Sequence, residues 1–376
     1  MLNLINIFSI TCGVFMSALP LVAISITHDE FKENSYAKKT DEKDELAKRN
    51  PIYIFINRGE DLKNTDLPIK LTDNMIELLK LDDLYNENDT FSEVVKKTQK
   101  KWLAVVQGKA MQETADPKAN TERNDLKDAS KQIAIKQKVE RVARAMGLFD
   151  NRNPILSNYK YGAWLGSYLQ GVRNNLEELV KVWQNGCRFE KLVVFTGERY
   201  LRKENGQEDD IKMLCDPKQS PLPFKEGWKL PTNSKYETEY DMMRLVFDQV
   251  QLPKDMEEEL LGKVEFVNAP KGQNVRAGTK DCYVTWLKTN PEAGTIVAAS
   301  YPLLWVIQQI AGETILGEKY PLDTIAPALS KEDYEKYKHA VVIVHDTVTK
   351  CLYEINNQIN ANSMQSKVVP FPRVEG

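Results

Sequence analysis

Leu192-Val193-Val194-Phe195 is the first of three short apolar runs that decide the fold of this 376-residue chain. The other two are Val264-Glu265-Phe266-Val267 and Thr295-Ile296-Val297-Ala298-Ala299, and a turn and a helical pattern follow each run. The first and third runs are almost continuously apolar, which is typical of strands covered on both faces. The repeated order of strand, loop and helix predicts an α/β fold, a three-layer sandwich with a mostly parallel sheet.

Turn residues mark the ends of these predicted strands. Gly197 follows the first run, Ala269-Pro270-Lys271-Gly272 follows the second, and Asn290-Pro291-Glu292-Ala293-Gly294 precedes the third. Parallel sheets bind ligands in the crevice at the carboxyl ends of their strands. We therefore expect the functional residues in the loops that follow the three runs.

Helical spacing of apolar residues predicts the elements around the sheet. A long helix is expected over 162–183, and Thr90 with Glu93 indicates a capping box for a helix over 90–106. Further helices are expected over 73–81, 133–146, 236–251 and 331–355, with a loop or frayed helix over 111–128. The helix over 133–146 is basic and amphipathic, so it either lies on a membrane surface or covers the domain as a solvated helix. Ile52-Tyr53-Ile54-Phe55-Ile56 is a candidate strand.

The amino-terminal segment predicts export. Met1 to Ile26 contains no charged residue, and at roughly 20 apolar residues it is long enough to span a bilayer. Ala23-Ile24-Ser25 offers the small residues that a signal peptidase requires, so cleavage after Ser25 competes with an uncleaved anchor. We expect a signal peptide or membrane anchor over 1–25, a polar linker over 26–50 and a mainly helical extension over 51–147. A Rossmann-like α/β domain over 148–369 and a tail over 370–376 complete the chain. We expect the product to be periplasmic, secreted or anchored in the membrane by this segment.

The cysteine content and the net charge indicate which kinds of site and partner to expect. Cys12 lies in the apolar leader, and Cys187, Cys215, Cys282 and Cys351 remain in the rest of the chain. These four could form two disulfides or stay as buried thiols, and their spacing is not that of a zinc site. The net charge of −3 and the lack of a long basic stripe argue against a nucleic-acid partner.

Several short matches between Arg173 and Gln309 resemble one protein family. They are the helix before Gly186, the strand Leu192 to Gly197, Thr238-Glu239 with Met242-Met243, the turn Asn274 to Thr279, and Ala299-Ser300-Tyr301-Pro302. In this order they resemble the SanA/YdcF-like family of bacterial envelope proteins. The resemblance implies a three-layer α/β domain, an envelope location and a nucleotide-like or other small ligand. This sequence has Glu198 where family members often carry a second glycine.

The loops after the predicted strands contain the candidate ligand-binding residues. Thr196, Gly197 and Arg199 belong to the loop after the first strand, where a glycine and a following helix start favour an anion. Asn274 and Arg276 follow the second strand, and Arg276 could hold a carboxylate or phosphate or form a surface salt bridge. Ser300 and Tyr301 follow the third strand, without the glycines that flank a nucleophilic serine. We expect a small anionic or nucleotide-like ligand here and identify no cofactor.

Glu198 and Glu239 are the candidate acid and base if the protein is an enzyme. The alternative role of Glu239 is to interact with the dipole of the helix that it opens. His339 and His345 are expected to be structural. The long connection over 203–235 is expected to cover the crevice, either as a lid that supplies Phe224 and Trp228 or as an insertion that packs its own aromatic side chains. A non-catalytic envelope protein on the same scaffold is the alternative function.

Overall fold

A five-stranded parallel sheet organises the protein. The computed structural model describes residues 50–58, 64–103, 134–203, 207–232, 235–270, 277–336 and 340–366, all within one compact unit, Lys43–Gly376. The strands are β1 (Asn158–Leu165), β2 (Arg188–Gly197), β3 (Val264–Ala269), β4 (Ile296–Ala299) and β5 (Leu322–Ile325), in the spatial order β3-β2-β1-β4-β5. Every neighbouring pair is parallel. The predicted fold class is confirmed, and the three apolar runs form β2, β3 and β4.

The central strand β1 was not predicted as a strand. The helix expected over 162–183 is wrong at its start, because Gly162 pairs with Leu192 of β2 and with Val297 of β4. Gly162 fits here because a Cβ atom would lie 2.6 Å from the ring of Phe189. The helix α7 (Leu169–Gln184) begins only after Tyr168, whose backbone is extended. Leu165 and Leu169 therefore share a helical spacing without sharing a helix.

Two further differences from the sequence predictions concern short segments. No strand was predicted at β5, where Asp323 interrupts the apolar pattern and accepts a hydrogen bond from the Ile155 N–H at 2.7 Å. The candidate strand 52–56 is wrong, because Pro51–Ile54 form the 3₁₀ helix η1. Asn50 caps that helix by accepting from the Ile52 N–H at 2.9 Å. Ile56 instead makes an isolated antiparallel bridge to Leu71.

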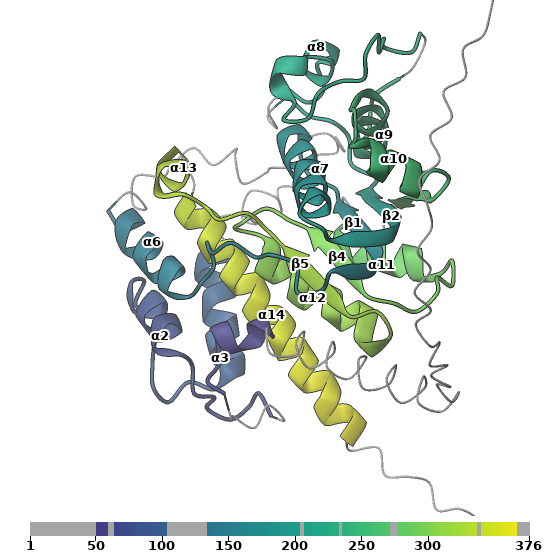
Figure 1. Cartoon of the computed structure of the whole chain (residues 1–376). Helices are drawn as coiled ribbons and strands as arrows, with labels where there is room; N and C mark the ends of the chain where they lie inside the picture. Colours follow the sequence, from purple (N-terminus) through teal and green to yellow (C-terminus); the bar gives the residue numbers. More distant parts are fainter. Residues whose placement is uncertain are drawn as a thin grey trace, which may run out of the picture. The chain divides into compact units, whose positions relative to one another are not determined.

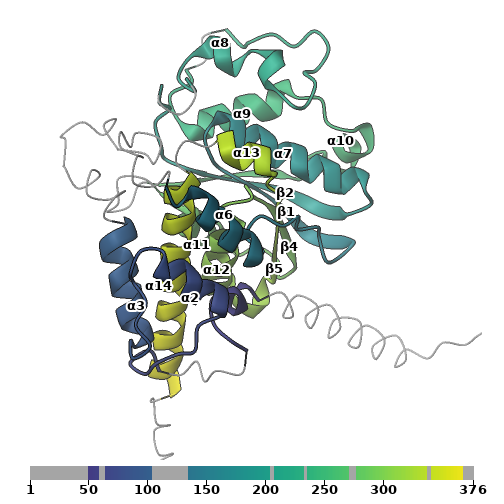
Figure 2. The same cartoon turned by 90° about the vertical axis from the view of Figure 1, so that its left-hand side faces the viewer.

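Helices cover both faces of the sheet (Figures 1 and 2). α7, α9 (Glu239–Gln249) and α10 (Lys254–Leu260) pack on one face, in a cluster with Trp164 and Val194. On the other face, α11 (Thr279–Leu287) and the end of α12 (Trp305–Leu316) pack with Phe195 and Ile296. The 3₁₀ helix η5 (Gly317–Lys319) follows α12. Side chains of the inner strands are buried on both faces, which explains their continuous apolar character.

A helical layer packs beside the sheet domain against α12. It contains α2 (Asp73–Lys80), α3 (Phe91–Thr98), the π-helical turn η2 (Gln99–Leu103), α6 (Lys136–Ala145), α13 (Lys331–Lys336) and α14 (Ala340–Ser366). The predicted helices over 73–81 and 236–251 are confirmed in α2 and α9, and those over 90–106 and 133–146 are confirmed over their described parts in α3 with η2 and in α6. Thr90 and Glu93 form the predicted capping box. The helix predicted over 331–355 corresponds to α13 and α14.

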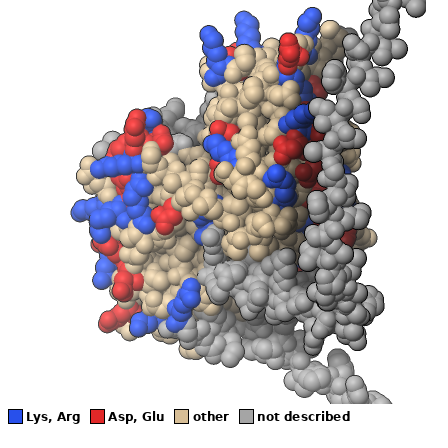
Figure 3. Space-filling view, viewed as in Figure 1, with Lys and Arg blue, Asp and Glu red and all other residues tan. Residues whose placement is uncertain are grey.

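The apolar side of α6 is buried in the helical layer, where Val139, Val142 and Ala143 join its core. α6 is thus a helix that covers the domain. Figure 3 shows Lys, Arg, Asp and Glu side chains interspersed over the exposed side of this layer. Arg141 of α6 forms an ion pair with Glu77 of α2. None of the helices within the described ranges is long and apolar enough to cross a membrane.

Several sequence predictions lie outside the described residues. These are the leader and Cys12, the linker over 26–49, the loop over 111–128, Asn274, Arg276, His339 and the tail over 370–376. The four other cysteines are free thiols, and Cys187, Cys282 and Cys351 are buried. Of the two alternatives for these cysteines, the structure shows the unpaired one.

Candidate functional site

The strand order reverses between β1 and β4, which is where sheets of this kind bind ligands. Gly166 follows β1 and donates its N–H to the Phe195 carbonyl of β2 at 2.8 Å. Ser300 follows β4 and donates its N–H to the Ile325 carbonyl at 2.9 Å. α7 begins at the same edge, and its N-cap residue Tyr168 makes no side-chain capping bond. The carboxyl edge therefore combines a glycine turn with a helix amino end, whose N–H groups favour anions.

Thr196 and Gly197 end β2 and pack tightly against their neighbours. The Thr196 hydroxyl is fully buried and donates to the Val267 carbonyl of β3 at 3.1 Å. A Cβ atom on Gly197 would lie 2.9 Å from the Ala277 carbonyl oxygen, just before α11. The glycine permits a close approach, as predicted, but the approaching group in this structure is the protein backbone.

Arg199 is the centre of a buried ion-pair network. Its Nε donates to Oε2 of Glu239 at 3.1 Å, and its Nη atoms form an ion pair with Glu208, which is 0% exposed. The remaining Nη hydrogens reach the carbonyls of Ser167 at 3.0 Å and Tyr200 at 3.4 Å. Burial alone would lower the pKa of Arg199, but the carboxylates of Glu239 and Glu208 raise it above its usual value. All five donors of the guanidinium are occupied by protein acceptors.

Glu239 lies against Gly166, which follows β1, and against Arg199, which follows β2. Thr238 caps α9, so Glu239 is its first residue and its side chain reaches back to the sheet edge. A Cβ atom on Gly166 would lie 2.9 Å from Cδ of Glu239, so the glycine makes room for this carboxyl group. Because an ionised carboxylate can only accept hydrogen bonds, the contact with Arg199 does not suit Glu239 to proton donation.

The other predicted site residues are more widely spread. Glu198 is partly exposed and donates its N–H to the Ala269 carbonyl at 2.9 Å. Ser300 is 1% exposed, and its hydroxyl donates to the Tyr301 carbonyl at 3.3 Å. Tyr301 packs against the core of the helical layer. The structure thus brings Arg199 and Glu239 into contact, whereas Ser300 and Tyr301 follow β4 on the other side of β1.

The long connection between β2 and α9 is closed at its base. The Leu201 N–H donates to the Glu237 carbonyl at 2.9 Å, the Glu239 N–H donates to the Arg199 carbonyl at 2.8 Å, and Tyr200 bridges to Thr238. Beyond this base lie the short helices α8 (Ile211–Leu214) and η4 (Pro217–Gln219). In both cartoons α8 stands beyond α7 and α9 (Figures 1 and 2).

The aromatic side chains of this connection pack on the connection itself. Phe224 and Trp228 contact each other in a T-shaped pair with ring centroids 5.6 Å apart. Trp228 also donates to Asp248, and Phe224 bridges to Val250, both at the end of α9 opposite to Glu239. Of the two roles expected for the connection, the structure shows the insertion that packs its own aromatic residues.

His345 is buried in the helical layer. Its ring stacks on Trp102 with centroids 4.3 Å apart, and Nδ1 lies 3.6 Å from Oδ2 of Asp82. Burial lowers the pKa of His345 to about 4, although Asp82 acts in the opposite direction. The ring belongs to the helical layer and not to the edge of the sheet.

Sequence reasoning missed Gly166, Ser167, Glu208 and the buried arginine of α7, Arg173. Gly166 and Ser167 follow an apolar run that was assigned to a helix, so a turn signal was present but not used. Glu208 lies in the long connection, where no periodicity indicated that it would be buried. Comparisons with family models, curated proteins and solved structures found no match to this chain.

Proposed function

We propose that this protein binds a small anionic or nucleotide-like ligand at the carboxyl ends of β1, β2 and β4. The observation that carries the proposal is the strand order, which puts a switch point between β1 and β4. The amino end of α7 starts from this point without a side-chain cap, and an anion would satisfy its first N–H groups.

The proposal includes an exported, envelope-associated protein of the SanA/YdcF-like type. The charge-free segment from Met1 to Ile26 supports export, either by cleavage or as a membrane anchor. Fractionation of cells that produce the full chain, followed by sequencing of the mature amino terminus, tests this part. A soluble cytoplasmic product that begins at Met1 would contradict it.

Binding without catalysis is the second candidate, a non-catalytic envelope interaction protein on the same scaffold. It is supported by the contact between Arg199 and Glu239, because this contact occupies one of the two predicted catalytic carboxylates. Glu198 remains the candidate acid or base of an enzyme. Ligand turnover that is lost in Glu198→Gln would favour the enzyme, and stable binding without turnover would favour the interaction protein.

A thermal-shift screen tests the binding proposal. The chain beginning at Thr27 is heated with nucleosides, nucleotides and inorganic phosphate at one ionic strength, because a ligand of the folded state raises Tm. The screen is repeated with Ser300→Ala at the carboxyl edge and with Arg276→Ala. Thr289→Ala, which removes an exposed hydroxyl bonded to the Trp286 carbonyl before β4, is the matched control.

A ligand that stabilises the parent chain and Thr289→Ala, but stabilises Ser300→Ala less, supports the proposed location. A ligand whose effect is equal in all variants binds elsewhere. If no compound of these classes changes Tm, the proposed ligand class is wrong.

A further inference from the structure

α7 contains a buried arginine whose guanidinium is only partly bonded. Arg173 is 1% exposed. Its Nη2 donates to the Leu214 carbonyl at 2.8 Å and approaches the Met213 carbonyl at 3.5 Å. Nε and Nη1 are also buried, and they find no hydrogen-bond acceptor among the residues that the structure describes. A cation is thus enclosed with two of its three nitrogens unsatisfied.

Arg199 shows what a satisfied buried arginine looks like in the same protein. It is bonded to two carboxylates and two carbonyls, and all its donors are used. Arg173 has two carbonyls and no bonded carboxylate. Asp216, whose charge acts on Arg173, uses Oδ1 to accept the Lys218 N–H at 2.9 Å and so caps η4. Both arginines are buried, but of the two only Arg199 is hydrogen-bonded to carboxylates within the described part of the chain.

A buried arginine with unsatisfied donors lowers the stability of the folded protein, so its presence calls for a functional reason. Burying an ion whose hydrogen bonds are incomplete costs several kcal/mol, and an apolar side chain of similar length would avoid that cost. Buried polar groups that remain unsatisfied in a native protein often mark a missing ion or a functional site. The chemical group that a guanidinium binds best is a planar carboxylate or a phosphate.

The position of Arg173 connects it with the carboxyl edge of the sheet. It lies in the second turn of α7, the helix that begins after β1. Neighbouring residues tie this part of α7 to the end of β1: Asn175 Nδ2 donates to the Leu165 carbonyl at 3.2 Å, and Trp164 Nε1 donates to the Val172 carbonyl at 2.8 Å. Long side chains of a helix point back toward its amino end, which here is the end at the switch point.

We infer that Arg173 is the anchor for a phosphate group and that α8 occupies its Nη2 donors in the structure described above. The inference rests on the proposed function and adds to it the residue that holds the anion. When phosphate enters, Arg173 releases the carbonyls of Met213 and Leu214 and donates to phosphate oxygens instead. α8 then acts as a cover that the ligand displaces.

The helix α8 is short enough to move. It has 4 residues, and the N–H groups of Met213 and Leu214 both donate to the Asp210 carbonyl, at 2.9 and 3.0 Å. The last N–H of this turn, that of Cys215, donates to the Ile211 carbonyl at 3.0 Å. Loss of the contact with Arg173 would weaken this single turn, which is otherwise held by the Asp210 side chain that caps it and by the packing of Leu214 in the core.

Two measurements test the inference on the chain beginning at Thr27. In the first, Tm is measured with inorganic phosphate, adenosine monophosphate and adenosine, against sodium chloride of equal ionic strength. We expect phosphate at about a hundred times its Kd to raise Tm by roughly 3 °C. The rise should disappear in Arg173→Met and shrink in Arg173→Lys, which keeps the charge but loses the planar fork.

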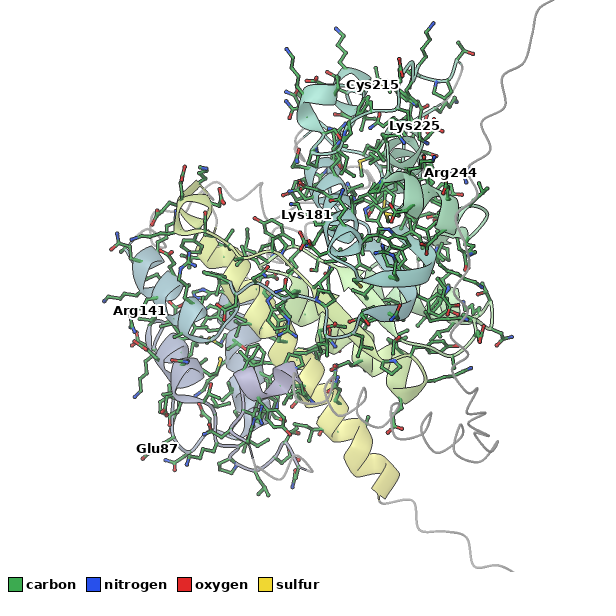
Figure 4. All side chains as sticks on the ribbon, viewed as in Figure 1. Glu87, Arg141, Lys181, Cys215, Lys225 and Arg244 are labelled. Atoms are coloured by element: carbon green, nitrogen blue, oxygen red, sulfur yellow. The ribbon has the colours of Figure 1, made fainter. Side chains whose placement is uncertain are left out.

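Lys181→Met is the matched control for Arg173→Met. Lys181 lies on the same helix, is 50% exposed and pairs with Glu177. Figure 4 shows Lys181 on α7 well away from Cys215, which follows α8. The phosphate effect should persist in this variant. An equal phosphate effect in the parent chain, Arg173→Met and Lys181→Met would overturn the inference.

The second measurement needs no variant, so it holds even if Arg173→Met does not fold. Amide hydrogen exchange is followed in the parent chain with and without saturating phosphate. We expect exchange at Met213, Leu214 and Cys215 to become about tenfold faster with phosphate, since a charge-assisted hydrogen bond to α8 is lost. Unchanged or slower exchange at these amides would contradict the displacement of α8.

The three ligands separate this inference from the proposed function. Phosphate stabilisation that depends on Arg173, with no added effect of adenosine monophosphate, supports the anchor and contradicts a nucleotide-like ligand. Stabilisation by adenosine monophosphate that is unchanged in Arg173→Met supports the proposed function and contradicts the anchor.

Discussion

The carboxyl group of Glu239 fills the space that a side chain on Gly166 would occupy, with Cδ of Glu239 only 2.9 Å from the position of such a Cβ atom. Gly166 follows β1 and Glu239 begins α9, so the contact joins two segments that are far apart in the sequence. It also holds the carboxylate where Arg199 can reach it. The glycine is therefore part of the ion-pair network, although it carries no charge.

Gly166→Ala should destabilise the protein by about 1–3 kcal/mol, because the added methyl group collides with Glu239 and forces it away from Arg199. Urea denaturation measures the loss. The double variant Gly166→Ala with Glu239→Ala should lose less than the sum of the two single variants, since the second change removes the collision. Additive losses would show that the two residues do not interfere.

Arg199→Met should cost about 3–5 kcal/mol of unfolding free energy, because it leaves the buried carboxylate of Glu208 without its cation. Adding Glu208→Gln should recover part of this loss. Lys254→Met is the control, since its ion pair with Glu258 is exposed and should contribute less than about 1 kcal/mol. A loss in Arg199→Met as small as in the control would refute a role of the network in stability.

His345 should make the protein less stable in mild acid. Burial lowers its pKa in the folded state to about 4 from an ordinary 6.5, so the unfolded chain binds the proton more readily. Stability is thus complete above pH 6.5 and is lost as the pH falls toward 4, by on the order of 2–3 kcal/mol. The groups that act on the ring are Asp82 of the turn after α2 and Lys101 of η2.

Urea midpoints at pH 7 and pH 5 measure this effect. His345→Gln should show a smaller decrease between the two pH values than the parent chain does. His339→Gln, which changes a histidine outside the described residues, serves as the control and should behave like the parent. An equal decrease in all three proteins would assign the acid sensitivity to other groups.

The four cysteines of the described part should react as thiols. In the chain beginning at Thr27, alkylation after unfolding without reductant should modify Cys187, Cys215, Cys282 and Cys351. In the folded protein Cys215 should react first, because it is only partly buried, whereas burial covers Cys187 and raises its pKa to about 11. Mass spectrometry counts the modified sites. A mass that shows two unreacted cysteines would reveal a disulfide.

The sheet could be predicted where apolar runs are flanked by turn residues. The runs that form β2, β3 and β4 are of this kind, and their direction followed from the helices between them. β1 was missed because Gly162 breaks its apolar run and because Leu165 and Leu169 imitate a helical spacing. β5 was missed because it is short and contains Asp323. Hydrogen bonds such as the one from the Ile155 N–H allow this polar side chain to be buried, and they cannot be read from the sequence.

The sequence predicted the place of the candidate site better than it predicted the interactions of its residues. The carboxyl ends of the strands do lie at one edge of the sheet, and Glu239 does begin a helix there. The sequence could not show that Arg199 and Glu239 bind each other, since Glu208, the third member of the network, lies in an irregular connection. A pairing between distant charged residues depends on tertiary geometry, which no local pattern encodes.

The bridge between Tyr200 and Thr238 closes the base of the long connection, so the sheet does not depend on which residues the connection contains beyond that base. Because the two chain ends already meet there, the entropy of loop closure depends only weakly on how many residues lie between them. Insertions or deletions within the outer part of this connection would leave the strand register intact. Evolution or design could therefore replace the outer part of this connection, and change the ligand preference of the protein, without changing the sheet.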